Sequence, residues 1–445
     1  MHRRTTRSRT AMAASAVAVG LVLSACTSTG SAPQGDPNAP IEVWTRSSDD
    51  TKKVYEKIFA AFTAKTGIKV NYNPPPYNDF DKRVQERAQA KDLPDIAITD
   101  TGSLGPYRKQ GYLTEVDRTS FAGQEQIVER AWNNGKAADG KYYAVPFSTQ
   151  AQVLLVRKDW REKVGKPIPT TWDELAALAN DFTTKDPDGN GDAKDTFGIV
   201  APGSTDRGYL AWWAANYIWQ AGGDILAESG GQYKVAVSSP QTLQAVNWLK
   251  GLFCDSKVTL PNALTMITND AHNYFEQGKA GIYLTGPYMF ARFDKAPGKD
   301  KYEVIPSPAG PAGSTVLGEG EVVYQMAGSP NPGNQKKLAE FLVSKQAQEL
   351  GMKAESGQRP VVRLSVNSTV DVKSVYNDPR WDTVAKVYAD SARPFPSVPN
   401  FQPFRQQTAE ALNSIFAKCG DASAELTKLA GNLEKELSNQ QKAAQ

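Results

Sequence analysis

The sequence predicts an α/β protein, and three neighbouring stretches near the start of its body indicate this fold class. Residues 41–44 and 68–72 alternate apolar and polar side chains, which is typical of strands. Between them, Val54, Ile58 and Phe62 recur at every fourth position, as on one face of a helix. A strand–helix–strand unit of about 30 residues implies a right-handed crossover and a parallel pair of strands. Sheets of this kind bind ligands beyond the carboxyl ends of their strands.

The later elements continue this alternation. Gly67 would end the first helix, and a capping box, Thr171-Trp172-Asp173-Glu174, would begin another that runs to about Thr183. A polar break at 148–150 would separate two strands. The other expected helices cover residues 78–90 and 336–350, a stretch that begins at Ser239-Pro240, and most of 405–445. The other expected strands cover residues 95–99, 142–147, 152–156, 280–285 and 322–324.

Residues 1–25 have the pattern of an export signal, and Cys26 follows them. Basic residues precede an apolar run from Ala11 to Leu23, which at about 13 residues is too short to span a bilayer as a helix. Leu23-Ser24-Ala25-Cys26 resembles the bacterial lipobox, in which the cysteine is acylated once the signal is cut away. An ordinary signal peptide with an incidental cysteine is the alternative. Residues 26–40, rich in Ser, Thr, Gly and Pro, would form a flexible tether.

Charge and histidine content exclude several function classes. Removal of residues 1–25 takes the formal net charge from +3 to −1, whereas a nucleic-acid-binding protein needs a basic face. Beyond His2 the chain has only His272, which we expect on a helix surface. A catalytic triad with histidine would have to use this one residue, and the usual zinc sites lack enough histidine and cysteine ligands. The common nucleotide-binding and nucleophile motifs are absent from the sequence as well. A glycosidase that uses two carboxylates stays open.

Cys254 and Cys419 are the cysteines that remain after Cys26. An even pair in an oxidising compartment predicts a disulfide bond between them. Two buried free thiols are the alternative, because the sequence does not show whether their Cα atoms approach to about 6 Å.

Residues 186–195 resemble the first half of a calcium-binding loop. Acidic or amide side chains stand at alternate positions, and a glycine is sixth, but the twelfth position is Phe197 in place of a bidentate glutamate. Either the loop is an acidic surface turn, or it holds a structural calcium ion, the one possible cofactor, through Asp186, Asp188, Asn190 and Asp195.

The order of these segments resembles the extracellular solute-binding proteins of carbohydrate ABC importers, the maltose-binding-protein family, over about residues 41–430. The stretches that carry the resemblance are the lipobox and residues 44–46, 95–100, 111–117, 144–147, 172–175, 286–288 and 339–342. The family implies a type II periplasmic-binding-protein-like fold, with two α/β lobes and a ligand cleft between them. It would place residues 41–148 and 316–352 in the N-terminal lobe, and residues 152–315 and 356–445 in the C-terminal lobe.

The resemblance also implies a function without catalysis. The lobes would close around a sugar or oligosaccharide by a hinge motion and deliver it to two permease subunits of an ABC transporter. The protein would be a lipid-anchored monomer on the outer face of the cytoplasmic membrane. Two rivals stay open: a lipoprotein glycoside hydrolase, and a receptor for another solute such as a glycerol phosphodiester.

A sugar site needs aromatic rings that stack on sugar faces and polar groups that bond to hydroxyls. The family places such rings at Tyr288 and, jointly, at Trp212 and Trp213, whereas Trp219 is expected in the core. Asp100 could equally cap the next helix, and Arg46 could form a surface ion pair. Several arginines near the cleft point to an acidic or strongly polar sugar. The remaining expected contacts are Trp44, Arg46, Thr99, Asp100, Gln150, Glu319, Glu321, Arg359 and Arg405.

Overall fold

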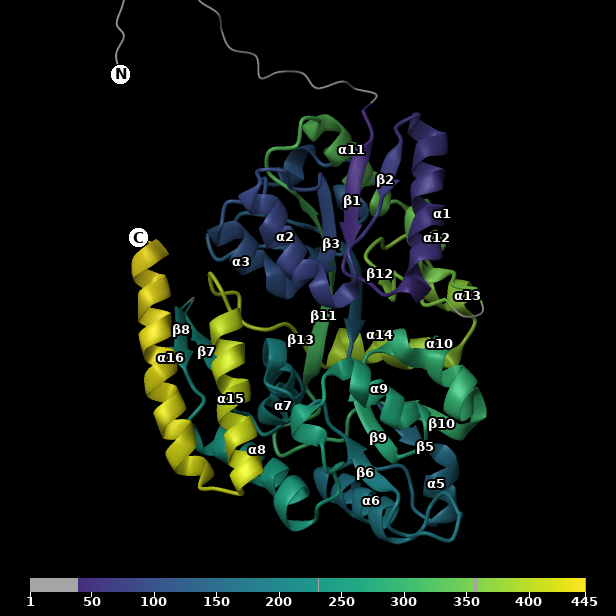
Figure 1. The fold of residues 1–445 in the computed structure, drawn as a ribbon, viewed down its shortest axis with the longest axis vertical. Coiled ribbons are helices and arrows are strands. Elements are labelled where there is room, and N and C mark those ends of the chain that lie inside the picture. Colours follow the sequence, from purple (N-terminus) through teal and green to yellow (C-terminus); the bar gives the residue numbers. More distant parts are fainter. Residues whose placement is uncertain (1–38, 231, 356–357, 445) are drawn as a thin grey trace, which may run out of the picture. The chain divides into compact units, whose positions relative to one another are not determined.

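The computed structural model describes residues 39–230, 232–355 and 358–444. The predicted strand–helix–strand unit is present, and both of its strands belong to the larger sheet (Figure 1). The predicted signal, Cys26 and the tether up to residue 38 lie outside the described residues. In this sheet β1 pairs in parallel with β2, as predicted, and also with β3, and β11 pairs antiparallel with β3 and β4. The strands are β1 (Ile41–Thr45), β2 (Val70–Tyr72), β3 (Ile96–Asp100), β4 (Val145–Ala151), β11 (Val316–Gln325), β12 (Leu364–Ser365) and β13 (Ala392–Arg393).

The helices around this sheet form the first lobe with most of its strands, while β12 and β13, which lie in the range predicted for the second lobe, join the sheet through β4 and β11. Helix α1 (Asp49–Thr66) buries Val54, Ile58 and Phe62 and ends at Gly67, whose φ of 76° suits a residue without a side chain. The predicted helix over 336–350 is two helices, because the chain leaves the first one at Val343 and Ser344 caps the second. The other helices here are α2 (Phe80–Gln89), α3 (Leu104–Lys109), α4 (Glu129–Trp132), α11 (Pro332–Leu342) and α12 (Lys345–Met352).

A four-stranded sheet forms the centre of the second lobe. Strand β9 pairs in parallel with β6 and antiparallel with β5, which also pairs with β10. The predicted capping box begins α6 at Trp172, with both of its hydrogen bonds present. The strands are β5 (Val153–Arg157), β6 (Phe197–Val200), β9 (Ala280–Thr285) and β10 (Tyr302–Ile305). The helices around them are α5 (Lys158–Lys163), α6 (Trp172–Thr184), α9 (Thr268–Glu276), α10 (Phe290–Phe293), α13 (Val372–Tyr376) and α14 (Pro379–Asp390).

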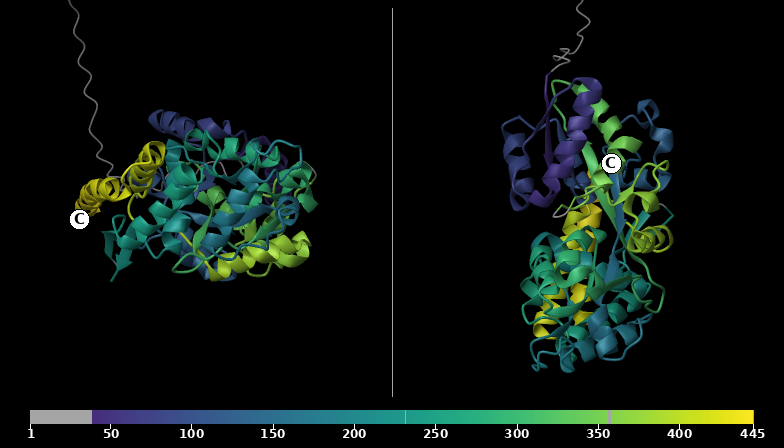
Figure 2. Two further views of the ribbon diagram at one scale, coloured as in Figure 1. Left: turned by 90° about the horizontal axis from the view of Figure 1, so that it is seen from below. Right: turned by 90° about the vertical axis from the view of Figure 1, so that its right-hand side faces the viewer.

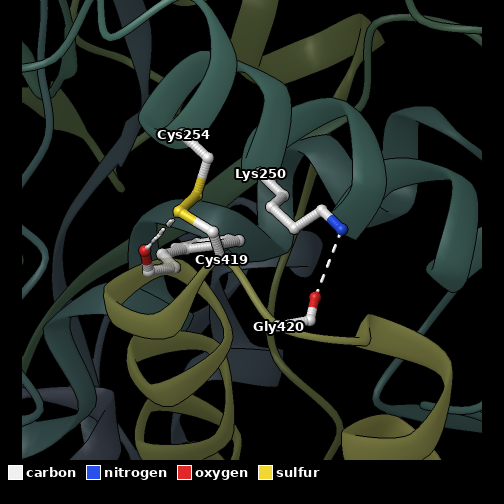
Figure 3. The surroundings of a disulfide bond; sticks show 5 residues. Lys250, Cys254, Cys419 and Gly420 are labelled. Atoms are coloured by element: carbon white, nitrogen blue, oxygen red, sulfur yellow. Dashed lines mark hydrogen bonds between the residues drawn. A yellow bond between two sulfur atoms is a disulfide. The ribbon is translucent and has the colours of Figure 1, made fainter.

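A layer of longer helices lies along one side of the second lobe, where α15 and α16 run side by side (Figures 1 and 2). Here the predicted disulfide is present: Cys254 follows α8, Cys419 ends α15, and their Cα atoms are 5.8 Å apart (Figure 3). Beside it, the Lys250 ammonium donates a hydrogen bond to the carbonyl of Gly420. The layer contains α7 (Tyr209–Gln220), α8 (Pro240–Lys250), α15 (Gln402–Lys418), α16 (Ala422–Ala444) and the hairpin of β7 (Leu226–Ser229) and β8 (Gln232–Val235).

The connections between the sheets correct two predicted elements. Residues 148–150 are not a break but part of β4, where Ser148 and Thr149 are buried against β11 and β12. Strand β11 is longer than predicted and includes Gly318 and Gly320, which let neighbouring backbone approach closely. Only Gln152 separates β4 from β5, so one extended segment links the two sheets. The residue bounds of the lobes stay a prediction.

The helices within the described residues contain no stretch that is long and apolar enough to cross a membrane.

Candidate ligand cleft

A cavity of about 190 Å³ lies between the two lobes, at the carboxyl ends of β1 and β3. Residues from the first lobe, from the linking strands β4 and β11, and from the second lobe all line it. The predicted site residues that it brings together are Arg46, Asp100, Gln150, Trp212, Tyr288, Glu319, Glu321, Arg359 and Arg405. Sequence reasoning missed Tyr77, Arg207, Tyr209, His272 and Arg363, which line it too.

Three predicted residues lie outside this cavity. Trp44 is buried in β1, with its indole N–H bonded to Glu42 and the Arg87 guanidinium 5.2 Å from its ring. Thr99 is buried within β3, one residue before Asp100. Trp213 is fully buried and packs on Tyr217 in the core of the second lobe, because one helical position turns it away from Trp212. Trp219 lies in the same core, as predicted.

Asp100 connects the two lobes electrostatically. Its carboxylate lies 3.4 Å from Arg46, which follows β1, and 3.2 Å from Arg207, which precedes α7 in the second lobe. Burial opposes its ionisation, but the two guanidinium groups hold the pKa of Asp100 below its usual value. Asp100 also accepts the backbone N–H of Gly102, so it caps the next turn as well. Asp100 therefore caps this turn and lines the cavity at once, and Arg46 lines the cavity too, while contact of either residue with a ligand stays a prediction.

Arg207 could hardly have been found from the sequence. It has a left-handed backbone with φ of 49°, and it also pairs with Asp81 on α2. Nothing in Thr205-Asp206-Arg207-Gly208 signals that this side chain crosses to the other lobe.

Glu319 faces the cavity from β11, directly opposite Gln150 on β4. The Trp212 indole N–H donates to both of its carboxylate oxygens, at 3.1 and 3.2 Å. Burial raises the pKa of Glu319 to about 7, and repulsion by Asp100 adds to this, while Arg405 works against it. Glu321, two residues further on, is held by Arg363 at 2.8 Å and by the Tyr55 hydroxyl at 3.2 Å.

Aromatic rings cover much of the cavity wall. The Arg46 guanidinium lies 4.1 Å from the centre of the Tyr77 ring, and the Tyr288 hydroxyl bonds to Thr285 at 3.0 Å. The expectation that His272 lies on a helix surface is wrong: it is buried in the middle of α9, with its Nδ1 3.0 Å from the Tyr283 hydroxyl. Burial keeps the pKa of His272 well below its usual value, so the ring is neutral. The carbonyl oxygen of the Gln150 side chain is buried without a hydrogen-bond partner.

A second cavity, of about 360 Å³, adjoins the first and shares Asp100, Glu319 and Arg405 with it. Its other walls come from the start of α3, from residues 133–138, from Glu228 and Tyr233 of the β7–β8 hairpin, and from the segment 393–402, which leads into α15. Arg405, on the first turn of α15, therefore stands at the wall between the two cavities.

The predicted calcium loop lies between α6 and β6, in the second lobe. The Asp186 carboxylate accepts the backbone N–H groups of Gly189, Asn190 and Gly191 at 3.0 to 3.2 Å. Asp195 is paired with Lys279 at 3.0 Å. Across the described residues, no three acidic, histidine or cysteine side chains are grouped closely enough to hold a metal. In this arrangement the carboxylates bind the loop's own N–H groups and a lysine. The binding of a calcium ion by this loop stays a prediction.

Comparisons with known proteins extend these observations. Residues 47–349 match the model of the family described as bacterial extracellular solute-binding protein. A binding protein of Brucella abortus is 26% identical over 394 residues, which cover 87% of this chain and 90% of the relative.

Solved structures show the same fold. A solute-binding protein of an ABC transporter from Thermotoga lettingae, bound to α-D-tagatose, has a TM-score of 0.77 at 22% identity, covering 90% of this chain and 100% of that one. UgpB of Mycobacterium tuberculosis, in complex with glycerophosphocholine, has a TM-score of 0.75 at 16% identity, with 90% and 99% covered. The two-lobed α/β fold predicted from the sequence is thereby confirmed, although the fold alone accommodates both kinds of ligand.

Proposed function

Because the chain belongs to the family of bacterial extracellular solute-binding proteins, we propose that it captures a sugar or oligosaccharide in this cleft and delivers it to the permease of an ABC transporter. The observation that carries the proposal is the composition of the cavity wall. Rings of Tyr77, Trp212 and Tyr288 alternate there with guanidinium, carboxylate and amide groups. Aromatic faces suit the C–H faces of sugars, and the polar groups suit their hydroxyls. The unpartnered oxygen of Gln150 is an acceptor ready for a ligand hydroxyl.

Reversible capture requires that the lobes move relative to each other. The cavity draws its walls from both lobes, so opening them would expose the ligand, and closing them would bury it. No covalent step is needed for this function, and the closed form is the state that the permease subunits would recognise. We propose the lobe bounds that the sequence predicts. The chain would then pass from one lobe to the other in β4, in β11 and in the segment near Arg359.

A panel of sugars tests the proposal. We expect a neutral or acidic mono- or oligosaccharide to raise the melting temperature of the purified protein, since a ligand at 100 times its Kd stabilises by about 2.7 kcal/mol. Calorimetry should give one site per chain. Trp212→Ala should weaken this binding at least about tenfold, whereas Trp44→Phe, outside the cavity, should not change it. The absence of any shift with every sugar, together with a shift for another solute, would contradict the ligand class.

The anchor is part of the same proposal. Cys26 lies outside the described residues, and its role rests on Leu23-Ser24-Ala25-Cys26 alone. Lipid on Cys26 and a short tether would keep a monomeric receptor at the outer face of the cytoplasmic membrane. Metabolic labelling with an alkyne fatty acid should mark the wild-type protein and not Cys26→Ser; equal labelling of both would refute the anchor.

One observation favours the rival hydrolase enough to test it. A carboxyl with a pKa of about 7, such as that of Glu319, is suited to general acid catalysis. We expect no turnover of chromogenic glycosides, because the Trp212 N–H already binds both oxygens of this group. Turnover by the wild type that Glu319→Gln abolishes would replace the receptor function with hydrolysis.

A further inference from the structure

The arginines of the smaller cavity differ in their partners. Five guanidinium groups line it, and four of them have a carboxylate within ion-pair distance. These pairs are Arg46 with Asp100 at 3.4 Å, Arg207 with Asp100 at 3.2 Å, Arg359 with Asp50 at 2.5 Å, and Arg363 with Glu321 at 2.8 Å. Among the described residues, no carboxylate lies within 4 Å of the fifth, Arg405.

Arg405 is held in place without being neutralised. Its Nε donates to the carbonyl of Gly208 at 3.2 Å, and its guanidinium carbon lies 5.9 Å from the centre of the Phe395 ring. The side chain lines both cavities, so Arg405 stands at the wall between them. Burial lowers the pKa of Arg405, and the acid that acts most strongly on this pKa is Glu319, whose own pKa of about 7 leaves it only partly charged near neutrality. Arg405 is half-buried, and withdrawing a cation from water without a counter-ion is costly.

We propose that Arg405 anchors an anionic group of the ligand, a sugar carboxylate or a phosphoryl group, at the wall between the two cavities. This inference rests on the proposed carbohydrate-binding function and adds a charge to the ligand. A guanidinium presents parallel N–H donors that match the two oxygens of a carboxylate or phosphate. The rest of the ligand would extend into the cavities on either side.

The surrounding charges allow an anion at this point. Asp100, the other acid shared by both cavities, is already neutralised by Arg46 and Arg207. Glu321 is likewise paired, with Arg363. Glu319 is the one acid of the shared wall that would oppose an anion, and protonation removes its charge. Close by, the Tyr288 ring and the free oxygen of Gln150 are placed for the uncharged part of the ligand.

Matched ligands separate charge from shape. We would measure calorimetric affinities for hexuronate oligosaccharides of galacturonate, glucuronate and mannuronate, for the neutral hexose oligosaccharides of the same linkage, and for glycerophosphocholine. The proteins are wild type, Arg405→Gln, Arg405→Lys and, as control, Arg83→Gln, which removes an exposed arginine of α2. Melting curves establish that each variant is folded.

We expect at least one uronate to bind about tenfold or more tightly than its neutral counterpart. Arg405→Gln should weaken that uronate about 10- to 100-fold and the neutral sugar by less than about threefold, with Arg405→Lys between, because only the charge-assisted contact is lost. Neutral sugars that bind while uronates do not, or an equal loss of both in Arg405→Gln, would overturn the anion anchor and leave the sugar receptor standing. Arg405-dependent binding of glycerophosphocholine alone would keep the anchor, with a phosphoryl source, and overturn the carbohydrate function. If no compound binds, the proposed function fails and the anchor with it.

Discussion

At the scale of single residues, Glu319 makes folding stability depend on pH. Its pKa rises from 4.5 when unfolded to about 7 in the protein, so the native state binds more protons than the unfolded state between these values. The contribution of Glu319 to the free energy of unfolding is therefore complete below about pH 4.5 and is lost as the pH rises through 7. The groups that act on Glu319 are the charges of Arg405, Asp100 and Arg363 and the Trp212 N–H.

Glu319→Gln keeps the acceptor for Trp212 but cannot ionise. We expect it to be more stable than wild type by roughly 1–3 kcal/mol at pH 8 and nearly equal at pH 4.5, as measured by urea unfolding at both values. Glu434→Gln, on the exposed face of α16, serves as the control and should show no such change. A difference between Glu319→Gln and wild type that is the same at both pH values would contradict the assignment.

Single residues of the cleft were predictable only where a strand end or a short motif marked them. Asp100 is the last residue of β3, so strand periodicity located it, whereas Tyr288, three residues after β9, was expected from the family resemblance. Trp212 and Trp213 could not be separated, because every residue of α7 is buried and no polar face indicates its orientation. Arg207 and Arg363 reach the cavity through tertiary packing, for which the sequence carries no local signal.

At the scale of elements, the loop between α6 and β6 gives the next prediction. Desolvation and the adjacent Asp186 carboxyl raise the pKa of the exposed Asp188, as expected where two carboxyl groups lie close together. A calcium ion would relieve this crowding after displacing Lys279 from Asp195. We expect saturable heat on calcium addition, and a melting temperature that rises by a few degrees, in wild type but not in Asp188→Asn. Magnesium is the control ion; no heat and no shift with calcium would identify a plain surface turn.

Elements with their own periodicity or caps were predicted well, and elements decided by their surroundings were not. Helices α1 and α6 begin and end near the predicted residues, because Gly67 and the capping box act locally. The polar residues 148–150 resemble a turn in sequence, yet neighbouring strands satisfy their backbone groups, so β4 continues through them. His272 misled for the same reason: its polar ring is buried beside Tyr283, a partner eleven residues away.

At the scale of the whole molecule, Arg207 connects the lobes across the cleft. It comes from the second lobe, and both of its acidic partners, Asp81 and Asp100, belong to the first. It holds this position in a left-handed backbone, which costs a residue other than glycine about 1 kcal/mol. The contact can exist only while the lobes are close together, so it stabilises the closed arrangement relative to the open one.

Arg207→Gln should therefore shift the lobes toward the open state. We expect a larger radius of gyration for the ligand-free protein in small-angle X-ray scattering. Ligand affinity should fall about 3- to 10-fold, because a smaller fraction of molecules is closed before binding. Arg161→Gln is the matched control, since Arg161 pairs with Glu303 inside the second lobe and does not cross the cleft. Unchanged scattering and affinity in Arg207→Gln would show that packing at β4 and β11, rather than this ion pair, sets the balance between open and closed lobes.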